Sequence, residues 1–291
     1  MAADVTEQNS WPVIALADGT RWAIRAADEE SAAVVRHLSR VMGLRPETGP
    51  ACELAVVVDR QRASDSLLEL TGLATGCHDL CTAVCRLSGG DQEPSLTYLY
   101  GLGAALSLCV QGPRAVLLHG ALAELDGTGV LLAGQSGAGK TTASERLPHP
   151  WRSLCDDSTL VVRDRAGTYW AHPWPTWSRF FLGEASGAAW NVQRAVMLRG
   201  IFFLEQSEVD WCEPVKAGEA VGYLLGLAEQ VSRIVLGELD REEARNARVR
   251  RLDTVCKLAQ AVPAHRLHAS RAGAFWQEIE RTLLDGTAGA S

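Results

Sequence analysis

The chain has 291 residues, of which 47% are hydrophobic and 22% charged, so it is long enough to bury a sizeable core and reads as globular. Its formal net charge of −7 excludes a global positive field of the kind that attracts nucleic acid or anionic lipid. No stretch approaches the roughly 20 apolar residues that span a bilayer, and the N-terminus is polar and acidic where a secretory signal would be basic and then apolar. We therefore predict a cytoplasmic protein with no nucleic acid and no membrane as partner.

Residues 1–95 predict a small α+β domain. Two apolar runs around Asp18-Gly19 predict a β-hairpin. The helix that follows is expected to begin after the capping residue Asp28 and to end at Gly43. Strands are predicted over residues 52–59, 67–70 and 81–87. Substrate recognition is one role open to this domain.

Residues 96–291 predict a second domain built on a mixed sheet. An apolar helix over 96–110 comes first, and Asp126-Gly127 then marks the turn of a strand hairpin. The middle is rich in strands, which are predicted over residues 114–125, 129–134, 152–157, 158–164, 168–174 and 199–205. Helices are predicted over residues 218–237, along the basic run that follows, and around 275–284. The expected fold class is therefore α/β (α+β), with a small N-terminal α+β domain.

A glycine-rich loop follows the apolar strand GVLLA and matches the eight-residue phosphate-loop pattern in full. The loop residues, with the next threonine, are Gly134, Gln135, Ser136, Gly137, Ala138, Gly139, Lys140, Thr141 and Thr142. Glycines let successive amide hydrogens point inward at a helix N-terminus, which forms an anion site. Lys140 would bridge the β- and γ-phosphates, the Thr141 hydroxyl would bind magnesium, and Ser136 lies where a hydroxyl could touch the γ-phosphate. We predict ATP and Mg²⁺ as cofactors; the alternative is a glycine-rich turn with no ligand.

Two adjacent aspartates, Asp156 and Asp157, follow the apolar run SLC. Like charges this close raise one pKa unless the pair is solvated or bound to a metal. Beside magnesium-ATP, one carboxylate could hold the metal while the other accepts the proton of an attacking hydroxyl. The alternative is a helix N-cap or an Asx turn, which Ser158 and Thr159 would favour.

The order of three segments resembles the catalytic domain of the HPr serine kinase/phosphorylase family, whose fold is shared with ATP-dependent phosphoenolpyruvate carboxykinase. The segments are HG at 119–120, GVLLAGQSGAGKTT at 129–142 and CDD at 155–157. The chain is also similar to the shorter HPr-kinase-like proteins of peptide-modification gene clusters. The resemblance implies Asp156 as base, Asp157 at the metal and His119 near the transferred phosphate, where the other interpretation is a core histidine at a strand end.

The sequence leaves several further residues with two interpretations each. The aromatic span 169–181 could stack a peptide or a base, with Arg179 near the phosphates, or could form a buried corner. Arg194 or Arg199 could close over the phosphates, and Glu205 could be a further metal-side acid or a solvated strand end. The basic run predicts a salt-bridged helix face or a docking patch for an acidic peptide, and it contains Arg241, Arg245, Arg248, Arg250 and Arg251. Cys77, Cys81 and Cys85 could be packing thiols, or they could serve metal or redox chemistry.

The function expected from these features is an ATP-dependent kinase that phosphorylates a serine or threonine hydroxyl on a peptide or small protein. Lys140, the two aspartates and His119 would form its catalytic group. One alternative is a nucleotide-dependent switch that binds or hydrolyses ATP without phosphorylating an acceptor. A second is a small-molecule kinase. The sequence leaves open whether the protein forms a homo-oligomer.

Overall fold

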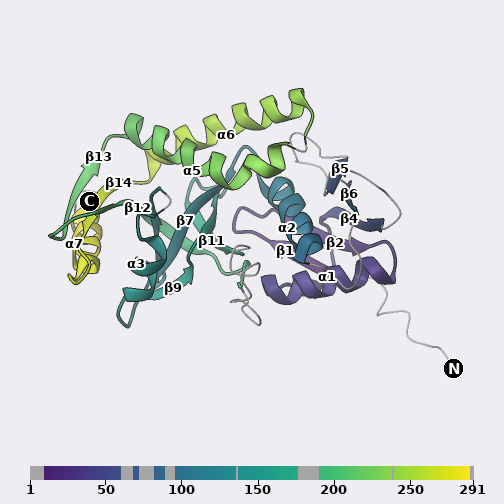
Figure 1. Cartoon of the computed structure of the whole chain (residues 1–291), viewed down its shortest axis with the longest axis horizontal. Coiled ribbons are helices and arrows are strands. Elements are labelled where there is room, and N and C mark those ends of the chain that lie inside the picture. Colours follow the sequence, from purple (N-terminus) through teal and green to yellow (C-terminus); the bar gives the residue numbers. More distant parts are fainter. Residues whose placement is uncertain are drawn as a thin grey trace.

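The computed structural model of the chain has two mixed sheets with helices, in agreement with the predicted α+β class. The two sheets lie next to each other along the long axis of the molecule (Figure 1). None of the helices in the described ranges combines the length and the apolar character needed to cross a membrane. The structure describes residues 10–59, 68–71, 82–88, 96–135, 137–175, 190–237 and 239–288.

The first sheet has the strand order β3-β1-β2-β4-β6-β5. Its strands are β1 (Trp11–Ala15), β2 (Arg21–Ala26), β3 (Arg45–Glu47), β4 (Cys52–Asp59), β5 (Leu68–Thr71) and β6 (Thr82–Ser88). β1 and β2 form the predicted hairpin around Asp18, whose carboxylate accepts hydrogen bonds from the backbone N–H and the hydroxyl of Thr20. β2, β4 and β6 run parallel, and β4 alternates buried and half-buried residues because one of its faces packs on helices.

Helix α1 (Glu29–Met42) covers this sheet and has the predicted ends. The Asp28 carboxylate accepts a 2.8 Å hydrogen bond from the Ser31 backbone, and Gly43 ends the helix in the left-handed conformation with φ of 64°. Helix α2 (Leu96–Val110) packs against α1 and β6. Thus the helix predicted to open the second domain lies on the first sheet, and the boundary at residue 95 stays a prediction.

The second sheet has the order β11-β10-β7-β8-β12-β14-β13, with β9 paired to β7. Its strands are β7 (Ala115–Leu125), β8 (Thr128–Ala133), β9 (Arg152–Cys155), β10 (Ser158–Arg163), β11 (Tyr169–Trp174), β12 (Val196–Gln206), β13 (Trp211–Val215) and β14 (Ala264–Ala269). Among the described strands of this sheet, the neighbouring pairs β8–β12 and β12–β14 are parallel. The sequence did not predict β13 and β14, although β14 extends the parallel centre of the sheet.

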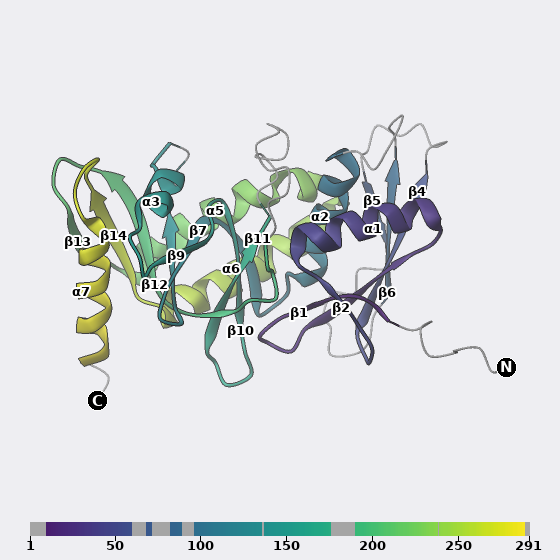
Figure 2. The ribbon, with the colours of Figure 1, turned by 90° about the horizontal axis from the view of Figure 1, so that it is seen from below.

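Helices cover both faces of this sheet (Figures 1 and 2). They are α3 (Lys140–Arg146), α5 (Ala217–Gly237), α6 (Arg241–Ala261) and α7 (Phe275–Ala288). On β8, Leu131 packs into the core that includes α5 and α6, whereas Leu132 packs into the core that includes α3 and α7. A strand buried on both faces needs apolar residues at successive positions, which explains the uninterrupted run VLLA ahead of the glycine-rich loop.

His172 on β11 links the two sheets. Its side chain is fully buried; Nε2 accepts a 3.2 Å hydrogen bond from the Ala17 backbone, and Nδ1 lies 2.7 Å from the Val192 carbonyl oxygen. Close by, the backbone N–H groups of Trp190 and Val192 donate to the carbonyls of Val41 and Met42 at the end of α1. A neutral ring with the proton on Nδ1 satisfies both partners, and burial holds the pKa of His172 below its ordinary value of 6.5.

Acid is expected to weaken this link. Because the pKa of His172 is depressed in the folded state, the contribution of His172 to the free energy of unfolding should be complete above about pH 6.5. That contribution should be lost as the pH falls from there through the folded-state pKa. Urea unfolding from pH 8 to pH 5 measures this slope in the wild type and in His172→Gln. The slope should be shallower in His172→Gln than in the wild type; equal slopes in the two proteins would contradict the assignment.

Candidate active site

The glycine-rich loop connects β8 to α3, as predicted. Gly137 and Gly139 have φ of 82° and 95°, in the left-handed region that favours glycine. A Cβ at Gly134 would lie 2.9 Å from the Ala138 Cβ and 3.3 Å from the Leu204 carbonyl oxygen, so a side chain there would displace the loop. Ser136 lies outside the described residues. The described glycines are therefore required by the backbone path of the loop.

Lys140, the first residue of α3, folds back over the loop. Its Nζ donates to the carbonyl oxygens of Gly134 at 2.9 Å and Gln135 at 3.1 Å, and the residue is only 7% exposed. Burial lowers the pKa of Lys140, and the carboxylate of Asp157 opposes that shift. Thr141 and Thr142 are exposed in the same helical turn. The lysine is thus held at the loop by weak neutral acceptors that an anionic ligand could replace.

Asp156 and Asp157 connect β9 to β10. Both strands pair with the same edge of β7, one after the other. β9 ends with Cys155 opposite Leu122, and β10 begins with Ser158 opposite His119. The two aspartates therefore sit across from Gly120, whose N–H donates a 2.8 Å hydrogen bond to the Asp157 carbonyl oxygen. Because β10 is a strand, the predicted alternative of a helix N-cap is wrong.

His119 and Gly120 fix this turn beside the glycine-rich loop. The Nδ1 of His119 lies 3.2 Å from Oδ1 of Asp157. Gly120 has no room for a side chain, because a Cβ would lie 2.8 Å from the Leu131 side chain and 3.1 Å from the Leu132 carbonyl oxygen. On the other edge of β7, Gly120 is paired with Ala133, the last residue before the loop. The register of β7 thus brings the aspartate turn and the loop together.

The charges of three predicted residues act on one another. Burial lowers the pKa of His119, the Asp157 carboxylate raises it, and the Lys140 ammonium lowers it. Asp157 also raises the pKa of Lys140. His119 therefore favours the neutral form, in which Nδ1–H can donate to Asp157. His119, Lys140 and Asp157 therefore form one electrostatic group.

Neighbouring buried groups hold the aspartate turn in place. The Cys155 thiol donates to the Ser158 carbonyl oxygen at 2.9 Å, and burial raises its pKa to about 11, so the thiol stays protonated. The Thr159 hydroxyl donates to the Gly120 carbonyl oxygen at 2.8 Å. The turn is therefore bonded to β7 through both main chain and side chain.

Asp157 and Thr141 are the residues predicted to bind a magnesium ion. Within the described ranges, no group of three or more His, Cys, Asp or Glu side chains could hold a metal by itself. Magnesium commonly uses one or two carboxylates, with substrate phosphates and water completing its octahedron. Asp157 and the Thr141 hydroxyl could supply the protein ligands of such an ion.

The model of the SynChlorMet cassette protein ScmC family matches residues 99–285, which is more than half of the chain. The chain belongs to the ScmC family. The matched segment contains the loop, His119 and both aspartates. No curated protein matches the chain.

In this ScmC family member, two of the candidate arginines lie away from the loop. Arg194 forms an ion pair with the buried carboxylate of Glu124, which is paired across the sheet with Gly129 near the start of β8. Arg199 lies in the first half of β12, which runs parallel to β8. Both arginines therefore lie towards the end of the sheet opposite the loop. Arg179 lies outside the described residues.

The described part of the aromatic span is a buried corner. Trp174 and His172 are buried, and the Trp170 indole donates a 2.9 Å hydrogen bond to Asp164. The rest of the span, from residue 176, lies outside the described residues. Among the three grouped cysteines, Cys85 lies on β6, and burial raises its thiol pKa to about 12, as expected of a packing thiol; Cys77 and Cys81 are also outside the described residues.

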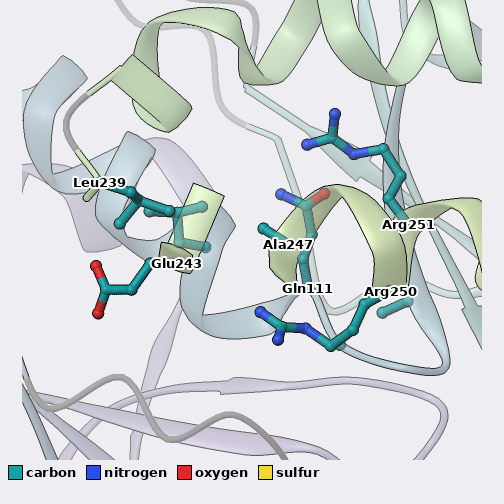
Figure 3. Close-up of a pocket in the computed structure, with 9 residues that line it drawn as sticks. Gln111, Leu239, Glu243, Ala247, Arg250 and Arg251 are labelled. Atoms are coloured by element: carbon teal, nitrogen blue, oxygen red, sulfur yellow. The ribbon is translucent and has the colours of Figure 1, made fainter. Parts of the chain in front are cut away.

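The basic run on α6 is partly salt-bridged. Arg251 and Arg248 lie 2.8 Å and 3.7 Å from the Glu229 carboxylate on α5. Arg250 and Arg251 line a small pocket of about 50 Å³ between α6 and the C-terminal end of α2, with Gln111 also in its wall (Figure 3). Arg248 and Arg251 thus join α6 to α5, whereas the spacing of the basic run predicted salt bridges along one helix face.

Sequence reasoning missed a larger pocket on the other side of the loop. It has a volume of about 810 Å³ and lies between the loop, the end of β12 and one face of α5. Glu205 and Gln206 contribute to its wall; Glu205 pairs with Arg266, and the Gln206 amide donates to the Gly137 carbonyl oxygen at 3.1 Å. Glu205 is thus held in a side-chain ion pair at the end of its strand. The one signal in the sequence was the pair Gly222 and Gly226 at helical spacing.

Proposed function

We propose that the protein is an ATP-dependent kinase of the HPr kinase type, which transfers the γ-phosphoryl group to a serine or threonine hydroxyl of a peptide or small protein. The observation that carries this proposal is the group formed by Lys140, His119 and Asp157 at the edge of the glycine-rich loop. A glycine-rich turn that binds no ligand does not require a carboxylate and a neutral histidine beside it. Membership in a cassette-protein family fits a role in a peptide-modification gene set.

Each residue has a task that follows from its position. Phosphoryl transfer depends mainly on positioning and on neutralising charge. Lys140 would leave the carbonyls of Gly134 and Gln135 and bind phosphate oxygens in their place. Asp156 would accept the proton of the acceptor hydroxyl, while Asp157 would hold Mg²⁺ and keep its contact with His119. The bound metal would supply positive charge against the β- and γ-phosphates.

The rival function is a nucleotide-dependent switch. It is favoured by one observation, since binding of phosphate must break the two Lys140 hydrogen bonds that now close the loop. ATP would then change the loop conformation whether or not a phosphoryl group is transferred. A switch needs Lys140 but has no need of a base at Asp156.

The variant Asp156→Asn distinguishes the kinase from the nucleotide-dependent switch. The purified protein is incubated with ATP, Mg²⁺ and a peptide fraction from its host, and phosphorylated products are detected by mass spectrometry. The kinase account predicts phosphopeptides with the wild type and none with Asp156→Asn, although both proteins bind ATP. The control is Asp126→Asn, the same chemical change in the exposed turn between β7 and β8. ATP binding without phosphopeptides from the wild type would support the switch instead.

A further inference from the structure

The glycine-rich loop has two different sides. On one side, β7 and β10 place His119 and Asp157 next to the loop. On the other side, β12 is paired with β8, and its end carries Leu204 and Gln206 past the loop. The acidic turn and the pocket of about 810 Å³ therefore lie on opposite sides of the same phosphate-binding backbone.

Two glycines of α5 hold this pocket open. Gly222 and Gly226 are one helical turn apart and both line the pocket. A Cβ built at either position would meet no heavy atom within 4 Å. Any larger side chain at Gly226 would thus project into the space in front of the loop. Neither glycine has a positive φ, so the backbone conformation of α5 does not require them.

Tyr223 gives the pocket an ordered aromatic wall. Its ring lies 4.9 Å from the ring of Phe203, measured between centroids. Its hydroxyl accepts a 3.0 Å hydrogen bond from Arg266 and donates one of 3.1 Å to Glu219. The ring is thus fixed at both ends before any ligand arrives, while the Gln230 amide adds a polar group to the same wall.

We propose that this pocket holds the purine base and ribose of the nucleotide whose phosphates lie on the glycine-rich loop. This inference rests on the proposed function for the position of the phosphates. With the terminal phosphate directed to Asp157, the rest of an extended nucleotide leaves the loop on the β12 side. Pockets for small ligands have volumes of about 300–1,000 Å³, with mainly apolar walls and a few polar groups. Flat aromatic bases fit against a glycine face and the Tyr223 ring.

The test compares ATP with magnesium tripolyphosphate, which has the phosphates but no nucleoside. Gly226→Leu fills the pocket while improving helix propensity, so α5 is expected to remain folded. By calorimetry, this variant should bind ATP at least about tenfold more weakly than the wild type and should bind tripolyphosphate equally well. Tyr223→Ala should weaken ATP binding selectively in the same way. Gly218→Leu is the matched control, because Gly218 also has open space around its Cβ on α5 but does not line the pocket.

Two outcomes would overturn the inference. One is ATP affinity that Gly226→Leu and Tyr223→Ala leave unchanged. The other is an equal loss of affinity for ATP and tripolyphosphate, which would mean that the nucleoside adds nothing at this pocket. Failure of the proposed function is visible separately: if the wild type binds ATP with the predicted selectivity but phosphorylates no peptide, the pocket assignment stands and the kinase proposal falls.

Discussion

Asp157→Asn is expected to lower the rate of phosphoryl transfer by about 10²–10³-fold, the loss found when one charge-stabilising group is removed from an active site. The asparagine oxygen can still accept from Nδ1 of His119, which lies 3.2 Å from the present carboxylate oxygen. Only the negative charge facing Lys140 and the proposed metal is lost. Initial rates at saturating ATP, Mg²⁺ and peptide measure the effect.

The comparison needs a protein with the same change elsewhere on the hairpin. Asp126→Asn serves, because Asp126 is exposed in the turn between β7 and β8, with φ of 48°, a conformation that asparagine tolerates well. Its transfer rate should equal that of the wild type. Asp157→Asn with an undiminished rate would remove this residue from the catalytic group.

Lys140→Met is expected to weaken ATP binding by about 10- to 100-fold, since hydrogen bonds to a charged group contribute about 1.5–3 kcal/mol. Methionine replaces most of the buried alkyl chain but cannot bind phosphate. The free protein loses only the hydrogen bonds to the Gly134 and Gln135 carbonyls, so α3 should remain folded. Calorimetric titration with magnesium-ATP gives the affinity directly.

Lys257→Met provides the control for charge and size. Lys257 is exposed on α6, where it pairs with Asp253 at 2.6 Å, and it does not line the pocket beside the loop. Its variant should bind ATP as the wild type does. If Lys140→Met also kept full affinity, the loop would not be a phosphate site.

Local patterns were sufficient to predict most of the elements. The hairpin at Asp18, the capped helix α1 and the strand β4 each have a signal that depends only on neighbouring residues. β14 was missed because its sequence AHRLHA buries only Ala264 and Leu267 and lies between two strong helices. Its position comes from parallel pairing with β12, which a short polar stretch does not encode locally.

The candidate site was predictable in its residue types but not in its geometry. The loop and the aspartate pair have fixed spacings along the chain, so the sequence alone identified them as candidate site residues. The contact between His119 and Asp157 depends on the register of β7 with β10, and the distant position of Arg194 depends on its ion pair with Glu124. The pocket beside the loop needs α5 to cross the sheet, which is a property of tertiary packing.

The kinase proposal is tested most directly by following the γ-phosphate and the α-phosphate of ATP separately. The wild type is incubated with host peptides and ATP labelled at either the γ- or the α-phosphate, and the peptides are then hydrolysed for phosphoamino acid analysis. The account predicts label from the γ-phosphate on serine or threonine, and no label from the α-phosphate. Release of γ-phosphate to water alone, with unlabelled peptides, would contradict it.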